Sequence, residues 1–167
     1  MPPPVLIPGL ATLDGLAADV SEDARRLANE FWPGALTLIL HSQPSLTWDL
    51  GETRGTVALR VPDDELAREI LDATGPLAVS SANRSGRAAA STAEDAEEQL
   101  AQSVVVYLDD GVRPREGEAL ASTIVDCTGR TPRVVRQGAL PLEELRRVAP
   151  DTLGLGEELP EEPARDA

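Results

Sequence analysis

Residues 35–41 read ALTLILH, an apolar run of strand length that is typical of a buried strand. Residues 56–61, TVALRV, form a second run of the same kind. A helix is predicted before the first strand, because apolar side chains recur at three- and four-residue steps between Ser21, a suitable N-cap, and Pro33. Alternating helices and strands of this kind predict an α/β domain.

The rest of the chain continues this pattern. A helix between Pro62 and Gly75 has acidic residues in its first turn, which stabilise the positive end of the helix dipole. Residues 122–127 and 132–137 are predicted to form an antiparallel hairpin, so the sheet is expected to mix parallel and antiparallel strands. The other expected elements are a short first strand at residues 5–7, a buried strand at 76–80, a helix capped by Ser91 or Thr92, a strand at 104–109 and a last helix at 142–148.

The composition fits one acidic domain. With 167 residues, of which 41% are hydrophobic, the chain is long enough to bury a core, and we expect a single domain over residues 1–150. Residues 151–167 hold six acidic residues and one arginine, and they are expected to be a disordered tail. The formal net charge of -14 argues against loose electrostatic binding to nucleic acids or anionic membranes. All 15 basic residues are arginine, which excludes lysine-based chemistry.

Two residue types that occur only once exclude further classes of site. One cysteine, Cys127, cannot form an internal disulfide, and one histidine, His41, does not support a histidine metal centre. The N-terminal segment has no basic region and only a short apolar run, so neither a signal peptide nor a membrane-spanning helix is expected there. These observations favour a cytoplasmic protein without a metal site of its own.

Three groups of polar side chains are candidates for a binding site. The loop after the expected strand at residues 76–80 carries Ser81 and Asn83, which suit a phosphate or carboxylate but also fit an ordinary polar turn. Arg60 lies inside an apolar strand, where it needs an anion unless strand alternation places it on the solvated face. Ser122 and Arg136 lie on the predicted hairpin, and in isolation ordinary polar residues at a strand edge explain them better.

Five motifs occur in a fixed order along residues 1–140. They are FWPGALTLIL, TVALRVP, PLAVSSANRSG followed by Ser91 and Thr92, ASTIVD, and VVRQGAL. In this order and spacing they resemble the YrdC/Sua5 family, the threonylcarbamoyl-AMP synthases. The resemblance implies an open, twisted sheet with flanking helices and a concave groove. It also implies a reaction in which L-threonine, bicarbonate and ATP give threonylcarbamoyl-AMP and pyrophosphate, the first step towards t6A at position 37 of tRNA.

The resemblance implies a role for each candidate residue on the threonine side. Arg60 would bind the threonine carboxylate through its planar fork of donors, and Ser81 and Ser122 would also contact threonine. Arg60, Ser81 and Asn83 would form the catalytic centre of the groove.

On the nucleotide side, the resemblance implies that Thr56, Asn83 and Ser91 lie near ATP and that Arg136 faces its phosphates. ATP is a substrate in this reaction, and Mg²⁺ is expected to enter with ATP and not through ligands of the protein. The expected partners are therefore L-threonine, bicarbonate and ATP, with tRNA or proteins of the t6A pathway further along. No membrane partner is expected.

One part of the family pattern is missing from this sequence. Family members carry a P-T-x-T-x-Y-G-L pattern and a K-x-R pair ahead of the segment that MPPPVLIPGL resembles, and this sequence contains neither. The expectation is a chain that lacks the family's N-terminal portion, forms the adenylate weakly and still binds threonine or nucleotide. A sheet without its opening strands would expose an edge, which predicts a homo-oligomer or a covering partner.

Two alternatives stay open. One is a non-catalytic paralogue that binds RNA or a nucleotide in translation, with a local basic patch formed by the loop arginines Arg84, Arg87, Arg113 and Arg115. The other is a domain related to the carbamoyl-transferring part of hydrogenase maturation proteins. This second alternative is disfavoured because the neighbouring zinc-finger and acylphosphatase modules are absent from this sequence.

Overall fold

The computed structural model describes residues 3–113 and 121–158. The chain forms two compact units, where the sequence predicted one domain over residues 1–150. The first unit comprises Met1–Ala78 and Ala121–Ala167, and the second comprises Val79–Leu120. The first unit holds the whole sheet.

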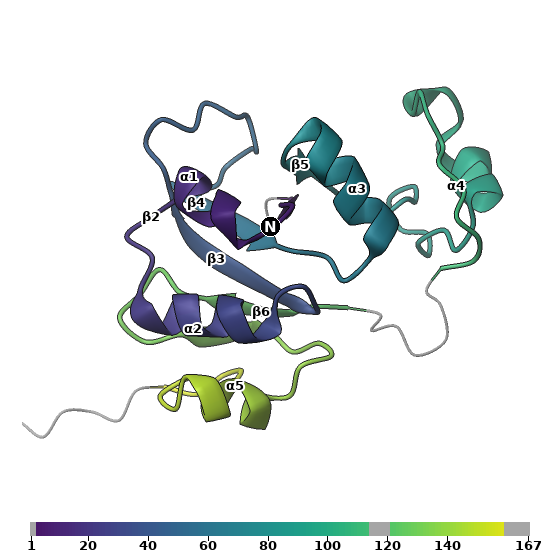
Figure 1. The fold of residues 1–167 in the computed structure, drawn as a ribbon. Helices are drawn as coiled ribbons and strands as arrows, with labels where there is room; N and C mark the ends of the chain where they lie inside the picture. Colours follow the sequence, from purple (N-terminus) through teal and green to yellow (C-terminus); the bar gives the residue numbers. More distant parts are fainter. Residues whose placement is uncertain (1–2, 114–120, 159–167) are drawn as a thin grey trace, which may run out of the picture. The chain divides into compact units, whose positions relative to one another are not determined.

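The sheet of the first unit mixes parallel and antiparallel strands, as the hairpin in the sequence predicts (Figure 1). Its strands are β1 (Val5–Leu6), β2 (Ala17–Ala18), β3 (Leu36–Ser42), β4 (Thr56–Arg60), β5 (Leu77–Ala78), β6 (Thr123–Asp126) and β7 (Arg133–Arg136). Their order is β5-β1-β4-β3-β6-β7, and β2 pairs with the end of β3. Strands β1 and β4 are parallel, as are β3 and β6, whereas β3 and β4 and also β6 and β7 are antiparallel.

Two helices of the first unit begin at side chains that cap their first turn. The helical elements of this unit are the 3-10 turn η1 (Leu10–Thr12) and helices α1 (Leu13–Leu16), α2 (Glu22–Phe31), α3 (Glu65–Thr74) and α5 (Leu142–Val148). The hydroxyl of Ser21 accepts a hydrogen bond from the backbone N–H of Ala24, which confirms the predicted cap of α2. Helix α3 begins after Asp64 rather than at Pro62, because the Asp64 carboxylate is the group that caps the first turn.

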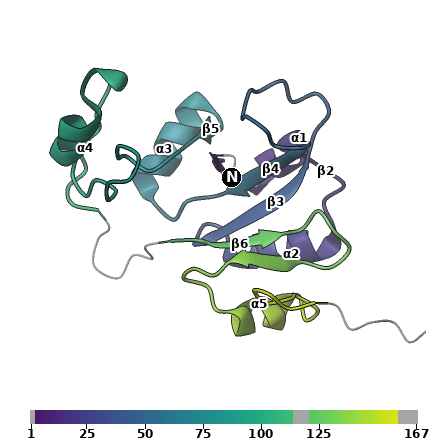
Figure 2. The same ribbon diagram turned by 180° about the vertical axis from the view of Figure 1, so that it is seen from behind.

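The two faces of strand β3 have different surroundings. Leu36, Leu38 and Leu40 are at most 1% exposed and belong to the core that also contains residues of α2 and α5. Helix α2 covers β6 from one side, in front of it in Figure 1 and behind it in Figure 2. Because side chains alternate along a strand, Thr37 and Ile39 point to the opposite face, called the open face below. Strand alternation therefore separates a core face of the sheet from an open face.

The first strand is not an edge of the sheet. The sequence predicted an unpaired edge at the chain's beginning, but β1 pairs with β4 on one side and with β5 on the other. The buried strand expected at residues 76–80 is wrong in extent, since β5 comprises two residues and both are exposed. The edge strands are therefore β5 and β7, and self-association through an edge stays a prediction.

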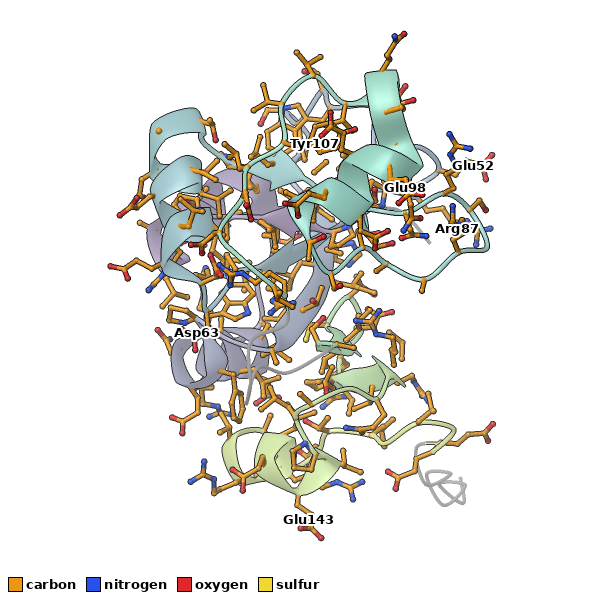
Figure 3. The ribbon with its side chains drawn as sticks, turned by 90° about the vertical axis from the view of Figure 1, so that its right-hand side faces the viewer. Glu52, Asp63, Arg87, Glu98, Tyr107 and Glu143 are labelled. Atoms are coloured by element: carbon orange, nitrogen blue, oxygen red, sulfur yellow. The ribbon has the colours of Figure 1, made fainter. Side chains whose placement is uncertain are left out.

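The second unit contains helix α4 (Ala93–Leu100) and the 3-10 turn η2 (Ala101–Ser103). Thr92, and not Ser91, caps α4, because its hydroxyl accepts from the N–H of Asp95 at 3.1 Å. The strand predicted at residues 104–109 is wrong: this segment pairs with no strand among the described residues, and a run of valines forms a strand only where a partner strand is present. Tyr107, labelled in Figure 3, instead donates its hydroxyl hydrogen to the carbonyl of Ala101.

The structure also differs from the tail expected over residues 151–167. Thr152 and Leu153 are buried, and Leu153 exchanges backbone hydrogen bonds with the β7 region. The carboxylate of Glu157 accepts from the Gly154 N–H and from Arg146, and both contacts lower its pKa. Backbone pairing therefore orders residues 151–158 despite their charge, while residues 159–167 lie outside the described residues.

Within residues 3–113 and 121–158 no helix combines the length and the apolar character that a bilayer crossing requires.

In helix α5, Glu143 projects away from the helix in Figure 3, as a charged residue on an exposed helix face does.

Gly138 allows the chain after β7 to lie directly against the start of β6. A Cβ at this position would be 2.4 Å from the carbonyl carbon of Ser122 and 2.6 Å from the carbonyl oxygen of Ala121. Gly129, in the turn between β6 and β7, has open space by comparison, since the nearest heavy atom to its Cβ position is 4.0 Å away.

We predict that Gly138→Ala lowers the free energy of unfolding by about 1–3 kcal/mol, because the backbone must move to admit the methyl group. The matched control Gly129→Ala is expected to change it by less than about 0.5 kcal/mol. Urea denaturation followed by circular dichroism measures both. Equal stability of the two variants would contradict the packing described for Gly138.

Candidate functional site

The open face of the sheet carries two adjoining depressions within the first unit. One, of about 340 Å³, is lined by Pro4, Thr37, Ile39, Ala58, Ser122, Ile124 and Arg136. The other, of about 290 Å³, is lined by Pro3, Ile39, Leu50, Thr53, Thr56, Val57 and Ala58. The cross-strand pair Ile39 and Ala58 borders both. The result is a mostly apolar surface with a few polar groups at its border.

Arg60 lies on this face of β4, two residues after Ala58. Its side chain is half-buried, and its Nε donates to the carbonyl oxygen of Gly34 at 2.9 Å. Burial lowers the pKa of Arg60, and the positive charge of Arg136 lowers it further, while Asp63, which precedes α3 (Figure 3), opposes the shift. Among the described residues no carboxylate forms an ion pair with Arg60. A desolvated cation of this kind favours binding of an external anion.

Arg136 is held against Ser122 by three hydrogen bonds. Its Nε and Nη2 donate to the Ser122 carbonyl oxygen at 3.2 and 2.8 Å, and Nη2 also donates to the Ser122 hydroxyl oxygen at 3.0 Å. The Ser122 hydroxyl oxygen in turn lies 2.8 Å from that of Thr37. Three side chains from three strand regions therefore form one polar cluster beside the first depression.

A β-bulge places Arg136 on the open face. Val134 pairs with Val125 and Arg136 pairs with Ile124, so Val135 is the extra residue between them. In a regular ladder without the bulge, Val135 would pair with Ile124 and Arg136 with Thr123, whose side chain is fully buried on the core side. The bulge turns the Arg136 guanidinium towards the side where Arg60 lies.

Thr56 lines the second depression. Its hydroxyl donates to the carbonyl oxygen of Thr53 at 2.7 Å, so its hydrogen is used within the loop that precedes β4. Its oxygen can still accept a hydrogen bond from a ligand.

The other predicted site residues lie in the second unit. The side-chain nitrogen of Asn83 donates to the carbonyl oxygens of Arg84 and Arg87, each at 3.0 Å, while its buried side-chain oxygen has no partner within the described residues. Ser81 is exposed and accepts the Asn83 N–H through its carbonyl. The carbonyl of Ser91 accepts from the N–H of Arg113. These contacts fit the polar turn that the sequence left open, and they leave the Asn83 oxygen as an acceptor.

The structure thus brings Arg60, Thr56, Ser122 and Arg136 to one face of the sheet, and it places Ser81, Asn83 and Ser91 in the second unit. Sequence reasoning missed Thr37. The available signal was a hydroxyl inside an apolar strand, two positions before Ile39 and therefore on the same face.

Other chemistry-bearing residues make internal contacts. Burial raises the pKa of the Cys127 thiol to about 12, which keeps the thiol neutral and a poor nucleophile. His41 places its Nε2 3.1 Å from the carbonyl oxygen of Thr128. Across the part of the chain that the structure describes, no three residues of His, Cys, Asp and Glu are grouped as a metal site.

Known proteins are similar in sequence to this chain over most of its length. The Sua5/YciO/YrdC family model, described as "Telomere recombination", matches residues 1–138. Over 148 residues the chain is 49% identical to a protein of Mycobacterium tuberculosis, in an alignment that covers 89% of this chain and 67% of that protein. A Pyrococcus abyssi protein named threonylcarbamoyl-AMP synthase is 35% identical over 137 residues, which cover 81% of this chain and 39% of that protein.

Solved structures share the fold as well. The crystal structure of P. abyssi Sua5 complexed with L-threonine matches with a TM-score of 0.82 at 30% sequence identity, covering 95% of this chain and 47% of that one. This match confirms the open, twisted mixed sheet with flanking helices. The chain spans between 39% and 67% of the length of these relatives. Because the family model and the fold both cover most of the sequence, the chain belongs to the Sua5/YciO/YrdC family.

Proposed function

We propose that this chain binds L-threonine and ATP on the open face of its sheet and serves the synthesis of threonylcarbamoyl-AMP. The observation that carries the proposal is the half-buried guanidinium of Arg60, which lies near a second cation, Arg136, and forms no ion pair with a described carboxylate. Family membership, the name of the P. abyssi relative and the L-threonine bound to P. abyssi Sua5 support it.

On the threonine side, Arg60 binds the substrate carboxylate with the two terminal nitrogens that its bond to Gly34 leaves available. Ser122, fixed by Arg136, contributes a hydroxyl to the same substrate. Ser81 stays a predicted threonine ligand.

On the nucleotide side, Arg136 faces the phosphates with Nη1, because only its Nε and Nη2 donate to Ser122. Thr56, which lines the second depression, lies near the nucleotide. Asn83 and Ser91 stay predicted nucleotide ligands. Mg²⁺ enters with ATP, where it neutralises phosphate oxygens.

The proposed reaction balances without a redox partner. The threonine amine attacks bicarbonate, forming a C–N bond and releasing water, and this gives a carbamate. A carbamate oxygen then attacks the α-phosphorus of ATP and pyrophosphate leaves. Arg60 and Arg136 stabilise the carboxylate and the phosphate charge during this step. The product is used to form t6A at position 37 of tRNA.

The alternative of a non-catalytic RNA-binding module has less support in the described residues. The guanidinium of Arg84 donates to the carbonyl of Gln99, and Arg113 forms an ion pair with Asp110. Arg115 lies outside the described residues. Two of the four loop arginines thus already have acceptors, and the chain carries a net charge of -14. Direct tRNA binding and a cytoplasmic location stay predictions.

We predict that the chain binds both substrates but turns them over slowly, since the sequence offers arginines but no lysine to the triphosphate. Titration calorimetry should give dissociation constants between about 1 μM and 1 mM for L-threonine and for ATP. Pyrophosphate release that requires both threonine and bicarbonate should stay below about 1 s⁻¹. Fast release would contradict the weak turnover, and binding of neither substrate would contradict the proposed function.

We predict that Arg60→Gln weakens L-threonine binding at least about tenfold, because the carboxylate loses its charged fork. Arg60→Lys should recover only part of the affinity, since an ammonium group cannot form the planar pair of bonds. The matched control is Arg130→Gln in the exposed turn between β6 and β7, which should bind like the parent chain. Unchanged affinity in Arg60→Gln, with a native circular dichroism spectrum, would remove Arg60 from the site.

A further inference from the structure

Among the described residues, the hydroxyl of Thr37 forms no hydrogen bond with a backbone group. Its side chain lies on the open face, is 2% exposed and lines the first depression. The Ser122 hydroxyl, 2.8 Å away, is its one hydrogen-bond partner among the described residues. A buried hydroxyl whose hydrogen has no acceptor costs free energy, so the acceptors of both hydroxyl hydrogens must be identified.

Thr123, the residue after Ser122, shows the contrast. Its hydroxyl accepts from the N–H groups of Gly138 and Leu140 and donates to the carbonyl oxygen of Leu140. Every donor and acceptor of this hydroxyl is used inside the protein. Thr123 therefore has a structural role that Thr37 does not share.

Of the two hydroxyl hydrogens of Thr37 and Ser122, only one is used in the hydrogen bond between them. Arg136 Nη2 donates to the Ser122 hydroxyl oxygen, so Ser122 accepts at that contact. The two hydroxyls share one hydrogen between them, and either can provide it. The second hydrogen has no acceptor within the described residues and lies at the wall of the depression. An oxygen atom of a bound molecule would satisfy it.

We propose that Thr37 is a positioning residue: it donates to the Ser122 hydroxyl oxygen and so directs the Ser122 O–H towards an anionic oxygen of the substrate. Ser122 then accepts two hydrogen bonds and donates one, which uses its full capacity. Consecutive hydrogen bonds polarise and strengthen one another, and the positive charge of Arg136 adds to this effect at the Ser122 hydroxyl. The anionic oxygen belongs to a carboxylate or to a phosphate. This inference rests on the proposed function for the identity of those ligands.

The test is titration of the full chain with L-threonine, ATP and inorganic pyrophosphate in separate experiments. Thr37→Val keeps the shape of the side chain and removes the hydroxyl, and we expect it to weaken one ligand class about three- to tenfold. A loss with L-threonine assigns the carboxylate, and a loss with ATP and pyrophosphate assigns the phosphate. Thr37→Ser, which keeps the hydroxyl, should bind within twofold of the parent chain.

A double-mutant cycle separates positioning from a purely structural effect. If Thr37 acts through Ser122, then Thr37→Val should change affinity less than about twofold when Ser122→Ala is already present. Losses that multiply, a Thr37→Ser variant as weak as Thr37→Val, or unchanged affinity in Thr37→Val would each overturn the proposal. A parent chain that binds pyrophosphate but not L-threonine contradicts the proposed function, and the same variants then test Thr37 with pyrophosphate. A parent chain that binds none of the three ligands overturns both.

Discussion

The hydrogen bond from Arg60 Nε to the carbonyl of Gly34 holds a cation on the open face of the sheet. Gly34 can hold that carbonyl in place because it lacks a side chain: a Cβ there would lie 2.5 Å from the carbonyl oxygen of Phe31. The end of helix α2, the start of strand β3 and the end of strand β4 are thereby tied together. Since no described carboxylate forms an ion pair with this half-buried guanidinium, the arrangement favours an anionic ligand there.

The rest of the site depends on how strands present their side chains. Leucines on one face of β3 build the core, and Thr37 and Ile39 on the other face build the depressions. Strand β7 would send Arg136 to the core face by simple alternation, but the extra residue Val135 brings it to the open face. A single inserted residue thus decides whether the second cation joins the site.

Elements set by local signals could be predicted from the sequence. The cap at Ser21, the strands β3 and β4, and helix α5 follow from hydroxyls, apolar periodicity and proline. The strand expected at residues 104–109 failed because strands need partners, which local sequence does not reveal. The packing of Thr152 and Leu153 was missed because their backbone pairs with a distant segment, and composition carries no information about such pairing.

The site was predicted in part for the same reason. Arg60 is a charged residue in an apolar strand, and the free-energy cost of burying that charge makes it a candidate without any comparison. Threonine is common in strands, so the sequence does not mark Thr37, and only its distance to Ser122 shows that it belongs to the polar cluster. Arg136 was a candidate on the predicted hairpin, but only the family resemblance gave it a role, because a bulge cannot be read from strand alternation.

A crystal structure of the chain grown with L-threonine and ATP tests the central claim most directly. We expect an anionic oxygen of a ligand within hydrogen-bond distance of the Arg60 guanidinium, with Arg136 and Ser122 beside the same ligands. A ligand bound elsewhere, or an Arg60 side chain paired with a carboxylate of the protein itself, would contradict it.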